Sequence, residues 1–448
     1  MHTARVRCRQ RQAGNSCVLG SAECGMVRSS EGCLRENRTH ACSPLGSGMD
    51  SRMKRILILM SDTGGGHRAS AEALRDALAE RFGDAVQVDM VDLWIQHTPP
   101  PLNRVPKAYR FLVDDLPWLY QFIYEAGERP NLVEPLMRVT AAFLQPFIGP
   151  ALARFHPDLI VSVHPLMQEI PLQVLAQMRW AIPFATVVTD LVTVPPVWFD
   201  PSVTLCFVPT DEAYHLALRS GLTSEQLCRC GLPIRPAFAR KVRPKALLRQ
   251  ELGMANGVPA ALLVSGAEGM GPVGDIARAV AHRLAAEPRD QGLAAGQLVV
   301  ICGRNDPLRH ELAARRWPVP TVVKGFVDNI WDWMAASDCI ITKAGPGTIA
   351  EALALGLPIL LSGYIPGQET GNVPYVLKHG VGLYLEEPQQ IAEVISGWFG
   401  PQRANLQQMA IQARRLGHPR AAYDIAEEIA KLLAEADHSQ RRQRVGGP

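Results

Sequence analysis

A histidine that directly follows three glycines is the residue of this sequence best suited to chemistry. His67 comes after the run Gly64 to Gly66, between an apolar strand-like stretch (56–60) and a helix-like stretch (70–82). Glycines permit a tight turn and a close approach of the backbone to another group, and the start of a helix offers unpaired N–H groups. A histidine placed there can take a proton from a hydroxyl group. A glycine turn beside an exposed histidine without function would give the same local pattern.

Two loops farther along the chain have the composition of a nucleotide site. The first follows a strand-like run and contains the small residues Ser265, Gly266, Gly269 and Gly271. The second joins a strand to a helix through Gly345, Gly347 and Thr348. Such loops present free N–H groups to phosphate oxygens. Glu351, one turn into the following helix, could accept hydrogen bonds from both hydroxyls of a ribose.

A third loop and one arginine extend this pattern to a nucleotide sugar. Gln368, Glu369 and Asn372 place three hydrogen-bonding side chains on one loop, as recognition of a hexose requires. Arg235 ends the first half of the chain, where its guanidinium could neutralise a leaving diphosphate. A surface arginine before a linker is the alternative for Arg235. The combination and order of these residues favour a nucleotide-sugar site.

Strands and helices alternate along two halves of the chain, which predicts two doubly wound parallel sheets of the α/β class. The first half should hold strands at 56–60, 86–91, 158–163, 184–189 and 203–208, with helices at 68–82, 168–179 and 211–220. The second should hold strands at 261–265, 297–302, 320–324, 338–342 and 358–361, with helices at 272–286, 307–316, 328–336 and 347–355. Ligands of such sheets bind at the carboxyl ends of the strands, so a substrate is expected between two facing halves.

The distribution of prolines and charges divides the chain into five segments. They are a leader (1–52), a first domain (53–235), a linker (236–256), a second domain (257–400) and a C-terminal segment (401–448). A helix at about 403–436 could cross back and tie the two halves together. The leader is rich in Arg and poor in acidic residues, which is typical of a transit peptide; a start codon wrongly assigned upstream of Met53 would look the same.

Composition excludes some classes of function. Lys and Arg total 46 against 43 Asp and Glu, so the net charge of the 448 residues is only +3. A nucleic-acid binder usually has a stronger basic bias, and no nucleic-acid partner is expected. No acidic DxD-like pair accompanies the phosphate loops, and the helix ends already offer positive potential, so neither a metal ion nor another cofactor is expected. The cysteines beyond the leader show no metal-binding spacing.

Two stretches have the composition of a membrane surface segment. Residues 104–124 interleave Lys and Arg with aromatic residues that include Trp118 and Phe122, and 139–153 are uncharged. Aromatic and basic residues together suit the headgroup boundary, although an amphipathic helix packed on a core would explain either stretch as well. The longest uncharged run, 352–368, contains two prolines and three glycines and does not predict a membrane-spanning helix.

From Met53 to about Gly400 the sequence resembles the monogalactosyldiacylglycerol synthases of plant plastids and some photosynthetic bacteria. The stretches that carry the resemblance are LILMSDTGGGHRASAEAL, VDLWIQHTPPPLNRVP, PDLIVSVHPLMQ, TDLVTVPPVWF, GLPIRPAF, GAEGMGP, ICGRN, CDCIITKAGPGTIAEAL and GYIPGQETGNVPYV. The resemblance implies the GT-B fold, in which two Rossmann-like domains face each other across a cleft. It also implies kinship with the lipid-linked N-acetylglucosaminyltransferase of peptidoglycan synthesis.

The implied activity is transfer of galactose from UDP-galactose to the free hydroxyl of 1,2-diacylglycerol, with inversion to a β-linkage. The enzyme would be peripheral on the cytoplasmic face of a membrane containing anionic lipids, or on the plastid envelope if the leader is a transit peptide. UDP-glucose is the alternative donor. A soluble UDP-sugar 2-epimerase of the same fold and a non-catalytic lipid-binding relative are alternatives of other classes.

The resemblance also assigns roles to individual residues. His67 would be the general base, Glu351 the ribose ligand, and Gln368 and Glu369 the sugar ligands. Arg235 and the loop 265–271 would hold the diphosphate, and Phe326 would contact uracil. Acceptor or lipid contacts would come from Gly65, Gly66, Pro100 and Trp198, together with Trp118 and Phe122 of the aromatic stretch. The plant-like context HTPWP is HTPPP here, which leaves activation by acidic lipid open.

Overall fold

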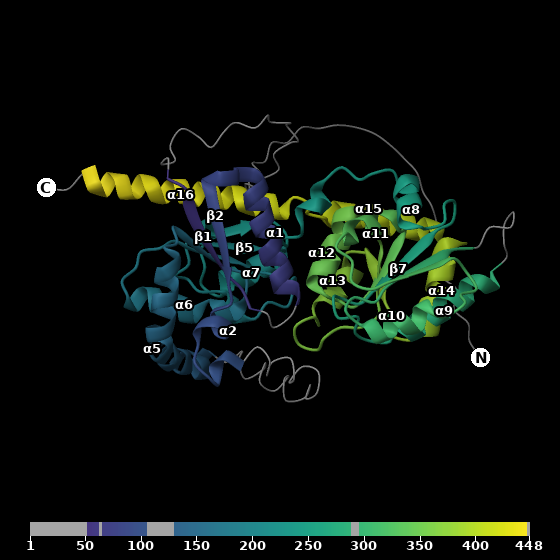
Figure 1. Cartoon of the computed structure of the whole chain (residues 1–448), viewed down its shortest axis with the longest axis horizontal. Coiled ribbons are helices and arrows are strands. Elements are labelled where there is room, and N and C mark those ends of the chain that lie inside the picture. The colour runs from purple at the N-terminus through teal and green to yellow at the C-terminus, as the bar shows by residue number, and fades with distance from the viewer. Residues whose placement is uncertain (1–51, 62–64, 105–129, 288–294, 446–448) are drawn as a thin grey trace, which may run out of the picture. The chain divides into compact units, whose positions relative to one another are not determined.

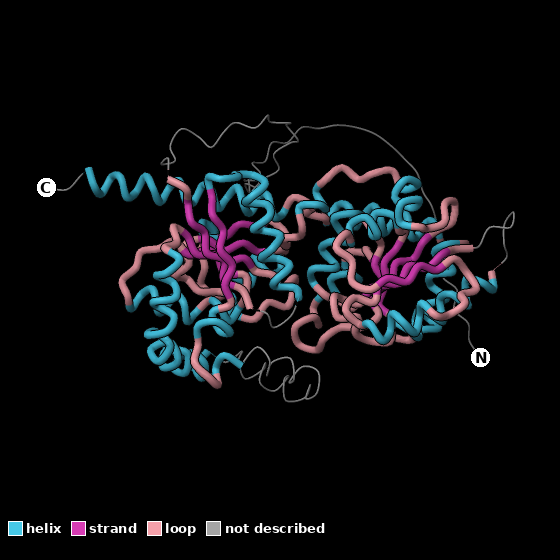
Figure 2. The backbone as a smooth tube through the Cα atoms, in the orientation of Figure 1, coloured by secondary structure: helices cyan, strands magenta, loops and turns pink. Residues whose placement is uncertain are grey.

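The computed structural model describes residues 52–61, 65–104, 130–287 and 295–445, with side chains left out at 130–138 and 438–445. The leader expected at 1–52 falls almost entirely outside the described residues, as do Trp118 and Phe122. Two parallel sheets of six strands each are surrounded by helices (Figures 1 and 2). The predicted α/β class with two doubly wound sheets is therefore confirmed.

The first sheet has the strand order β2-β1-β3-β4-β5-β6. Its strands are β1 (Lys54–Leu59), β2 (Val86–Val91), β3 (Leu159–Ser162), β4 (Phe184–Val187), β5 (Leu205–Val208) and β6 (Leu227–Arg229). The helices of this half are α1 (Gly65–Phe82), α2 (Leu93–His97), α5 (Pro130–Phe155), α6 (Glu169–Gln177) and α7 (Asp211–Arg219). Leu59 is in register with Val91 on one side and Ser162 on the other, so the segments after β1, β2 and β3 leave the sheet at one edge.

The second sheet has the order β12-β11-β10-β7-β8-β9. Its strands are β7 (Ala260–Val264), β8 (Gln297–Ile301), β9 (Thr321–Lys324), β10 (Cys339–Thr342), β11 (Ile359–Leu361) and β12 (Gly382–Tyr384). The helices are α8 (Lys245–Leu252), α9 (Val273–Ala286), α10 (Asp306–Ala313), α11 (Ile330–Ala336), α12 (Pro346–Leu355), α13 (Asn372–Lys378), α14 (Pro388–Phe399), α15 (Arg403–Leu416) and α16 (Ala421–Val445).

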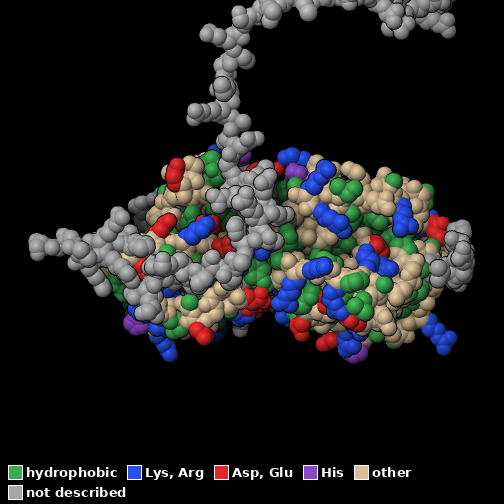
Figure 3. All heavy atoms as spheres, turned by 90° about the horizontal axis from the view of Figure 1, so that it is seen from above, with side chains coloured by type: hydrophobic (Ala, Val, Ile, Leu, Met, Phe, Trp, Pro, Cys, Tyr) green, Lys and Arg blue, Asp and Glu red, His purple; other side chains and the backbone are tan. Residues whose placement is uncertain are grey.

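Helices cover both faces of each sheet, because successive strand residues point to opposite faces and nearly all of them are apolar. In the first sheet, Ile56 and Ile58 pack against α1, while Leu57 and Leu59 share a core with α5 and α6. In the second, Leu263 packs with α9 and α14, and Leu262 packs with α11 and α12. Charged side chains of both signs are interspersed on the face seen in Figure 3, in keeping with the small net charge.

The last helix packs on the first sheet although it follows the second in sequence. Ile425, Ala426 and Ile429 of α16 are fully buried in the core that contains α1. Figure 1 shows α16 running beside α1 and β1. The stretch 236–256, expected as a linker, holds α8, whose buried Arg249 donates to the carbonyls of Ala336 and Val258 and to Asp338. These contacts attach the stretch to the second half; the domain boundaries themselves stay predictions.

Helix α5 is amphipathic but not uniformly covered. Its buried side includes Leu144, Ile148 and Leu152, which join the core of the first sheet. Its other side exposes Val139, Phe143 and Phe147, which are spaced by four residues and are 69%, 59% and 43% exposed. The expected amphipathic helix is therefore present, and it presents a second apolar stripe away from the core.

Candidate active site

His67 lies in the first turn of α1, at the carboxyl edge of the first sheet. Its Nδ1 is 2.7 Å from Oγ1 of Thr189 and 3.2 Å from the carbonyl oxygen of Val163. The Thr189 hydroxyl itself donates to that carbonyl at 3.3 Å. Its Oγ1 is therefore left to accept a hydrogen bond from Nδ1–H of His67. Because a carbonyl can only accept, these contacts favour a proton on Nδ1 and a lone pair on Nε2. That tautomer is the one a general base needs.

Burial and the carboxylate of Asp190 act on the pKa of His67, and a second histidine lies beside its ring. Burial lowers the pKa of His67, while the carboxylate of Asp190 and the Val163 carbonyl oppose this shift. The ring of His164 lies edge-on to that of His67, with centroids 4.3 Å apart. Burial first, and then His67, lower the pKa of His164 well below its usual value, so His164 stays neutral. A neutral His67 beside a buried carboxylate can accept a proton and be stabilised once charged.

Asp190 connects this histidine to the loop of the other half that holds Gln368, Glu369 and Asn372, called the sugar loop below because these residues are the expected sugar ligands. Its two carboxylate oxygens accept from Nε1 of Trp198 at 2.6 Å and from Nε2 of Gln368 at 3.3 Å. Burial raises the pKa of Asp190, whereas His67 and the two hydrogen bonds lower it. Next to this link, the backbone N–H of Gly371 donates to Oγ1 of Thr193 at 2.8 Å.

The expected lipid contact at Trp198 is wrong. Its side chain is fully buried and donates to Asp190, so it offers no surface to a lipid. Trp198 instead positions the carboxylate.

Pro100 is exposed and stays a candidate for lipid contact. A Cβ on Gly65 would lie 3.6 Å from the Cβ of Ala267, and one on Gly66 would meet nothing within 4 Å. The glycine turn therefore contacts the loop expected to hold the diphosphate.

The backbone conformation of the loop from Ser265 to Gly271 depends on its glycines. Gly266, Gly269 and Gly271 have φ of +66°, +62° and +82°, a region that favours glycine. A Cβ on Gly269 would lie 2.1 Å from the carbonyl oxygen of Cys302, so no side chain fits there. The loop thus packs against the stretch after β8. It also joins β7 to α9, and this position between a strand and a helix is the one that the sequence predicted.

Arg235 and Glu351, expected to bind the diphosphate and the ribose, lie side by side. Nη1 of Arg235 is 3.9 Å from Oε1 of Glu351, and their side chains are 30% and 16% exposed. Burial raises the pKa of Glu351 to about 7, and Arg235 opposes this shift. Gly345 is the N-cap of α12, so Gly347 and Thr348 lie in the first turn of the helix that carries Glu351.

The sugar loop is held by its own polar side chains. Glu369 is buried, forms an ion pair with Lys343 and accepts from the N–H of Ile365 at 2.9 Å. Nδ2 of Asn372 donates to the carbonyl of Ala344 at 2.9 Å, while its buried Oδ1 has no hydrogen-bond partner among the described residues.

Phe326, the expected uracil contact, is 46% exposed, with the guanidinium of Arg304 5.0 Å from its ring centroid. Both the ring of Phe326 and the loop remain candidates for ligand contact.

Four residues of this site were not predicted from the sequence: Thr189, Asp190, His164 and Lys343. Thr189 and Asp190 follow β4, His164 follows β3, and Lys343 follows β10. Polar residues just after buried parallel strands are a signal that could have identified all of them.

The described part of the chain contains no group of three or more His, Cys, Asp or Glu side chains arranged to hold a metal ion. Among the same residues, no helix is both long and apolar enough to cross a membrane.

Comparison with known proteins identifies the family. Residues 67–234 match the family described as monogalactosyldiacylglycerol (MGDG) synthase, and residues 273–429 match the C-terminal domain of glycosyltransferase family 28. The chain is 46% identical to monogalactosyldiacylglycerol synthase 1, chloroplastic, of Arabidopsis thaliana over 91% of its own length and 77% of the relative. It is 45% identical to the chloroplastic synthase of Spinacia oleracea, over 96% of this chain and 82% of the relative.

Solved structures with low sequence identity share the fold. MurG of Acinetobacter baumannii is 15% identical with a TM-score of 0.55, over 84% of this chain and 99% of that one. The glycosyltransferase SnogD of Streptomyces nogalater is 18% identical with a TM-score of 0.55, over 85% of this chain and 100% of that one. A structure of S. aureus MnaA with UDP has a TM-score of 0.54 at 15% identity, over 85% and 97% of the two chains. The expected GT-B architecture is confirmed.

Proposed function

Because the chain belongs to the monogalactosyldiacylglycerol synthase family, we infer that it transfers galactose from UDP-galactose to 1,2-diacylglycerol. The observation that carries this inference is identity of about 45% to curated synthases over most of the chain. It separates the chain from the soluble 2-epimerases, which share the fold at 15% identity or less.

The reaction needs one displacement with inversion at the anomeric carbon. Nε2 of His67 takes the proton of the acceptor hydroxyl as its oxygen forms a bond to C1 of the sugar. The bond from C1 to the diphosphate breaks, and its electron pair goes to the departing UDP. The Nδ1 contacts to Thr189 and Val163 support this role, because they leave Nε2 to face the acceptor.

Donor binding is assigned to the second sheet. Glu351 would accept from the ribose hydroxyls, Arg235 and the loop 265–271 would hold the diphosphate, and Gln368 with Glu369 would hold the sugar. The contact of Arg235 with Glu351 supports this arrangement, because ribose and diphosphate are adjacent in UDP. Helix ends and basic side chains would offset the charge of the leaving group without a metal ion.

The proposal includes peripheral attachment to a membrane that contains anionic lipid. Diacylglycerol resides in a bilayer, so the enzyme must reach the bilayer surface. The exposed stripe Val139, Phe143 and Phe147 on α5 supports this, and the rings of the two phenylalanines lie 6.3 Å apart. The cytoplasmic face of a membrane is the expected side, or the plastid envelope, since the plant relatives are named chloroplastic.

The stripe can be tested with vesicles. Phe143→Ser combined with Phe147→Ser should weaken binding to vesicles of neutral and anionic lipid without changing affinity for UDP. Ile411→Ser on α15 is the matched control, because Ile411 is an apolar side chain of similar exposure, 49%. Unchanged vesicle binding in the double variant would show that the stripe is not the contact surface.

The activity is tested by incubating the purified protein with diacylglycerol and either UDP-galactose or UDP-glucose. Product identification by mass spectrometry and by NMR of the anomeric proton should give β-galactosyl diacylglycerol. If the glucosyl product formed at an equal or greater rate than the galactosyl product, UDP-glucose would replace UDP-galactose as the assigned donor. Sugar isomerisation without a lipid product would contradict the transferase.

A further inference from the structure

Lys343 lies where three loops of the expected donor site meet. It directly follows β10, and its Cε is 3.5 Å from the position a Cβ would take on Gly266. Its Nζ is 3.4 Å from the corresponding position on Gly345, at the N-terminus of α12. The same Nζ forms the ion pair with Glu369 of the sugar loop. The end of one lysine side chain therefore borders both glycine loops and the sugar loop.

The surroundings of Lys343 hold its ammonium group in place. Its side chain is 22% exposed, and that of Glu369 is 4% exposed. The second oxygen of Glu369 accepts from the N–H of Ile365, so the carboxylate is fixed from two sides. An ammonium group has three N–H donors, and Glu369 takes one of them. Two donors are thus left for a ligand, and Nζ lies beside Gly345 at the start of α12.

We propose that Lys343 is a ligand of the donor diphosphate and supplies, together with Arg235, the positive charge that stabilises departing UDP. This proposal rests on the proposed function, because it needs the donor at the carboxyl edge of the second sheet. When the bond from C1 to the β-phosphate oxygen breaks, the electron pair stays on that oxygen and its negative charge grows. A cation that contacts this oxygen is worth most at that moment.

Glu369 holds Lys343 in place in this arrangement. Arg235 approaches from the end of the first half and contacts Glu351, whereas Lys343 approaches from between the two loops. Two cations from different segments can thus oppose the charge of a diphosphate. Lysine serves here as a compact point charge rather than a bidentate fork.

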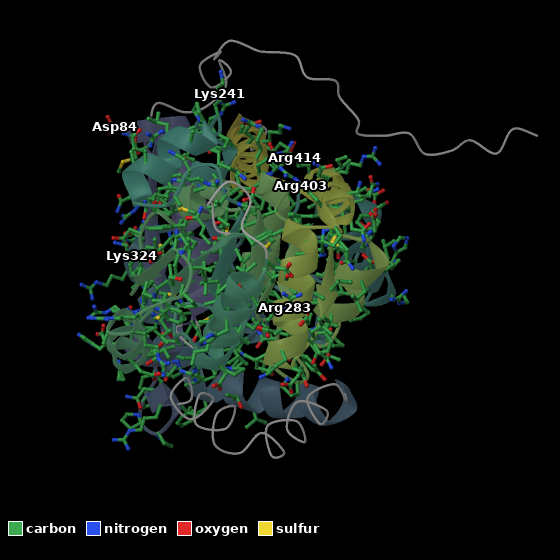
Figure 4. All side chains as sticks on the ribbon, turned by 90° about the vertical axis from the view of Figure 1, so that its right-hand side faces the viewer. Asp84, Lys241, Arg283, Lys324, Arg403 and Arg414 are labelled. Carbon is green, nitrogen blue, oxygen red and sulfur yellow. The ribbon has the colours of Figure 1, made fainter. Side chains whose placement is uncertain are left out.

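Calorimetry with uridine and UDP tests the assignment, because the two ligands differ only in the diphosphate. Lys343→Gln should leave uridine affinity unchanged and reduce UDP affinity roughly 10- to 100-fold, the range for a lost charged hydrogen bond. Lys343→Arg should retain most of the UDP affinity. Lys241→Gln is the matched control, since Lys241 is exposed at the surface (Figure 4). This variant should bind both ligands as the unaltered protein does.

The alternative role for Lys343 is to anchor the sugar loop through Glu369. Glu369→Gln breaks the ion pair but keeps the ammonium group, so UDP affinity should fall less in this variant than in Lys343→Gln. Equal losses of UDP affinity in Glu369→Gln and Lys343→Gln, or equal losses of uridine and UDP affinity in Lys343→Gln, would overturn the proposal. Unchanged UDP affinity in Lys343→Gln would overturn it while leaving the proposed function intact. Failure of the unaltered protein to bind UDP would overturn both.

Discussion

Glu351, the proposed ribose ligand, should make opposite contributions to stability and to donor binding, and Glu351→Gln separates them. Burial raises the pKa of this carboxyl from 4.5 to about 7. The folded state therefore keeps a proton that the unfolded chain releases between these two pH values. Stability falls as the pH rises through this window, and the full cost is present above about pH 7.

The size of this cost follows from the shift. A difference of about 2.5 pKa units at about 1.4 kcal/mol per unit gives about 3.5 kcal/mol, and the low exposure of the side chain leaves little screening by water. Glutamine cannot ionise, so Glu351→Gln should be more stable than the unaltered protein at pH 8 by up to about 3.5 kcal/mol. The advantage should shrink as the pH falls towards 4.5. Arg235 loses its partner but is 30% exposed and stays hydrated.

Ligand binding should change in the other direction. Ribose hydroxyls donate to the ionised carboxylate, so uridine affinity should fall up to tenfold per pH unit below about 7 in the unaltered protein. Uridine is the ligand of choice because it has no phosphate that titrates in this range. Glu351→Gln should bind uridine more weakly at pH 8 and lose the pH dependence.

Chemical unfolding and calorimetry from pH 5 to pH 8.5 measure both effects. Asp84→Asn is the matched carboxylate-to-amide control, because Asp84 is exposed (Figure 4). A Glu351→Gln protein that is less stable than the unaltered protein at pH 8, or that keeps the same pH dependence of uridine binding, would refute the reasoning.

Three further predictions concern the acceptor side and the sugar loop. His67→Ala should reduce turnover roughly 10²- to 10⁴-fold while UDP affinity by calorimetry stays unchanged, and equal loss of UDP affinity would indicate a structural role. Gln368→Ala should weaken UDP-galactose binding but not UDP binding; a matching loss for plain UDP would remove Gln368 from the sugar site. Trp198→Phe keeps an aromatic ring but removes the donor to buried Asp190, which should cost about 1.5–3 kcal/mol of unfolding free energy and lower turnover. Unchanged stability and turnover would show that the Asp190 carboxylate does not depend on this bond.

Local pattern predicted the regular elements because buried parallel strands are nearly continuous apolar runs. The run 86–91 is β2 without a change of bounds, and 297–302 differs from β8 by one residue. Strands β6 and β12 were missed as elements, since three residues at a sheet edge are too few for a periodic pattern. The helix expected at 403–436 is two helices, α15 and α16. Gly417 ends the first, where a Cβ would lie 2.4 Å from the carbonyl oxygen of Leu353.

Contacts between distant segments could not be predicted from the same patterns. The loops 265–271 and 343–351 were visible because each combines a strand end, glycines and a helix start within a few residues. Asp190 also follows a strand, but no glycine or helix start lies beside it in the sequence, and its partner Gln368 is 178 residues away in the chain. Trp198 was assigned to lipid only through the resemblance to the plant enzymes, whereas tertiary packing buries its side chain completely.

The buried carboxylate of Asp190 is the point at which the acceptor and donor sides are joined. Its charge favours the protonated form of His67, and a donor from each side, Trp198 and Gln368, stabilises that charge. A sugar that draws Gln368 away would remove one of these hydrogen bonds and favour protonation of Asp190. A sugar that binds while Gln368 keeps its bond leaves the carboxylate ionised and His67 able to hold a proton. If Gln368 is a sugar ligand as proposed, we therefore expect efficient transfer in the second geometry, in which Gln368 contacts the sugar through its amide oxygen and Asp190 through its amide nitrogen.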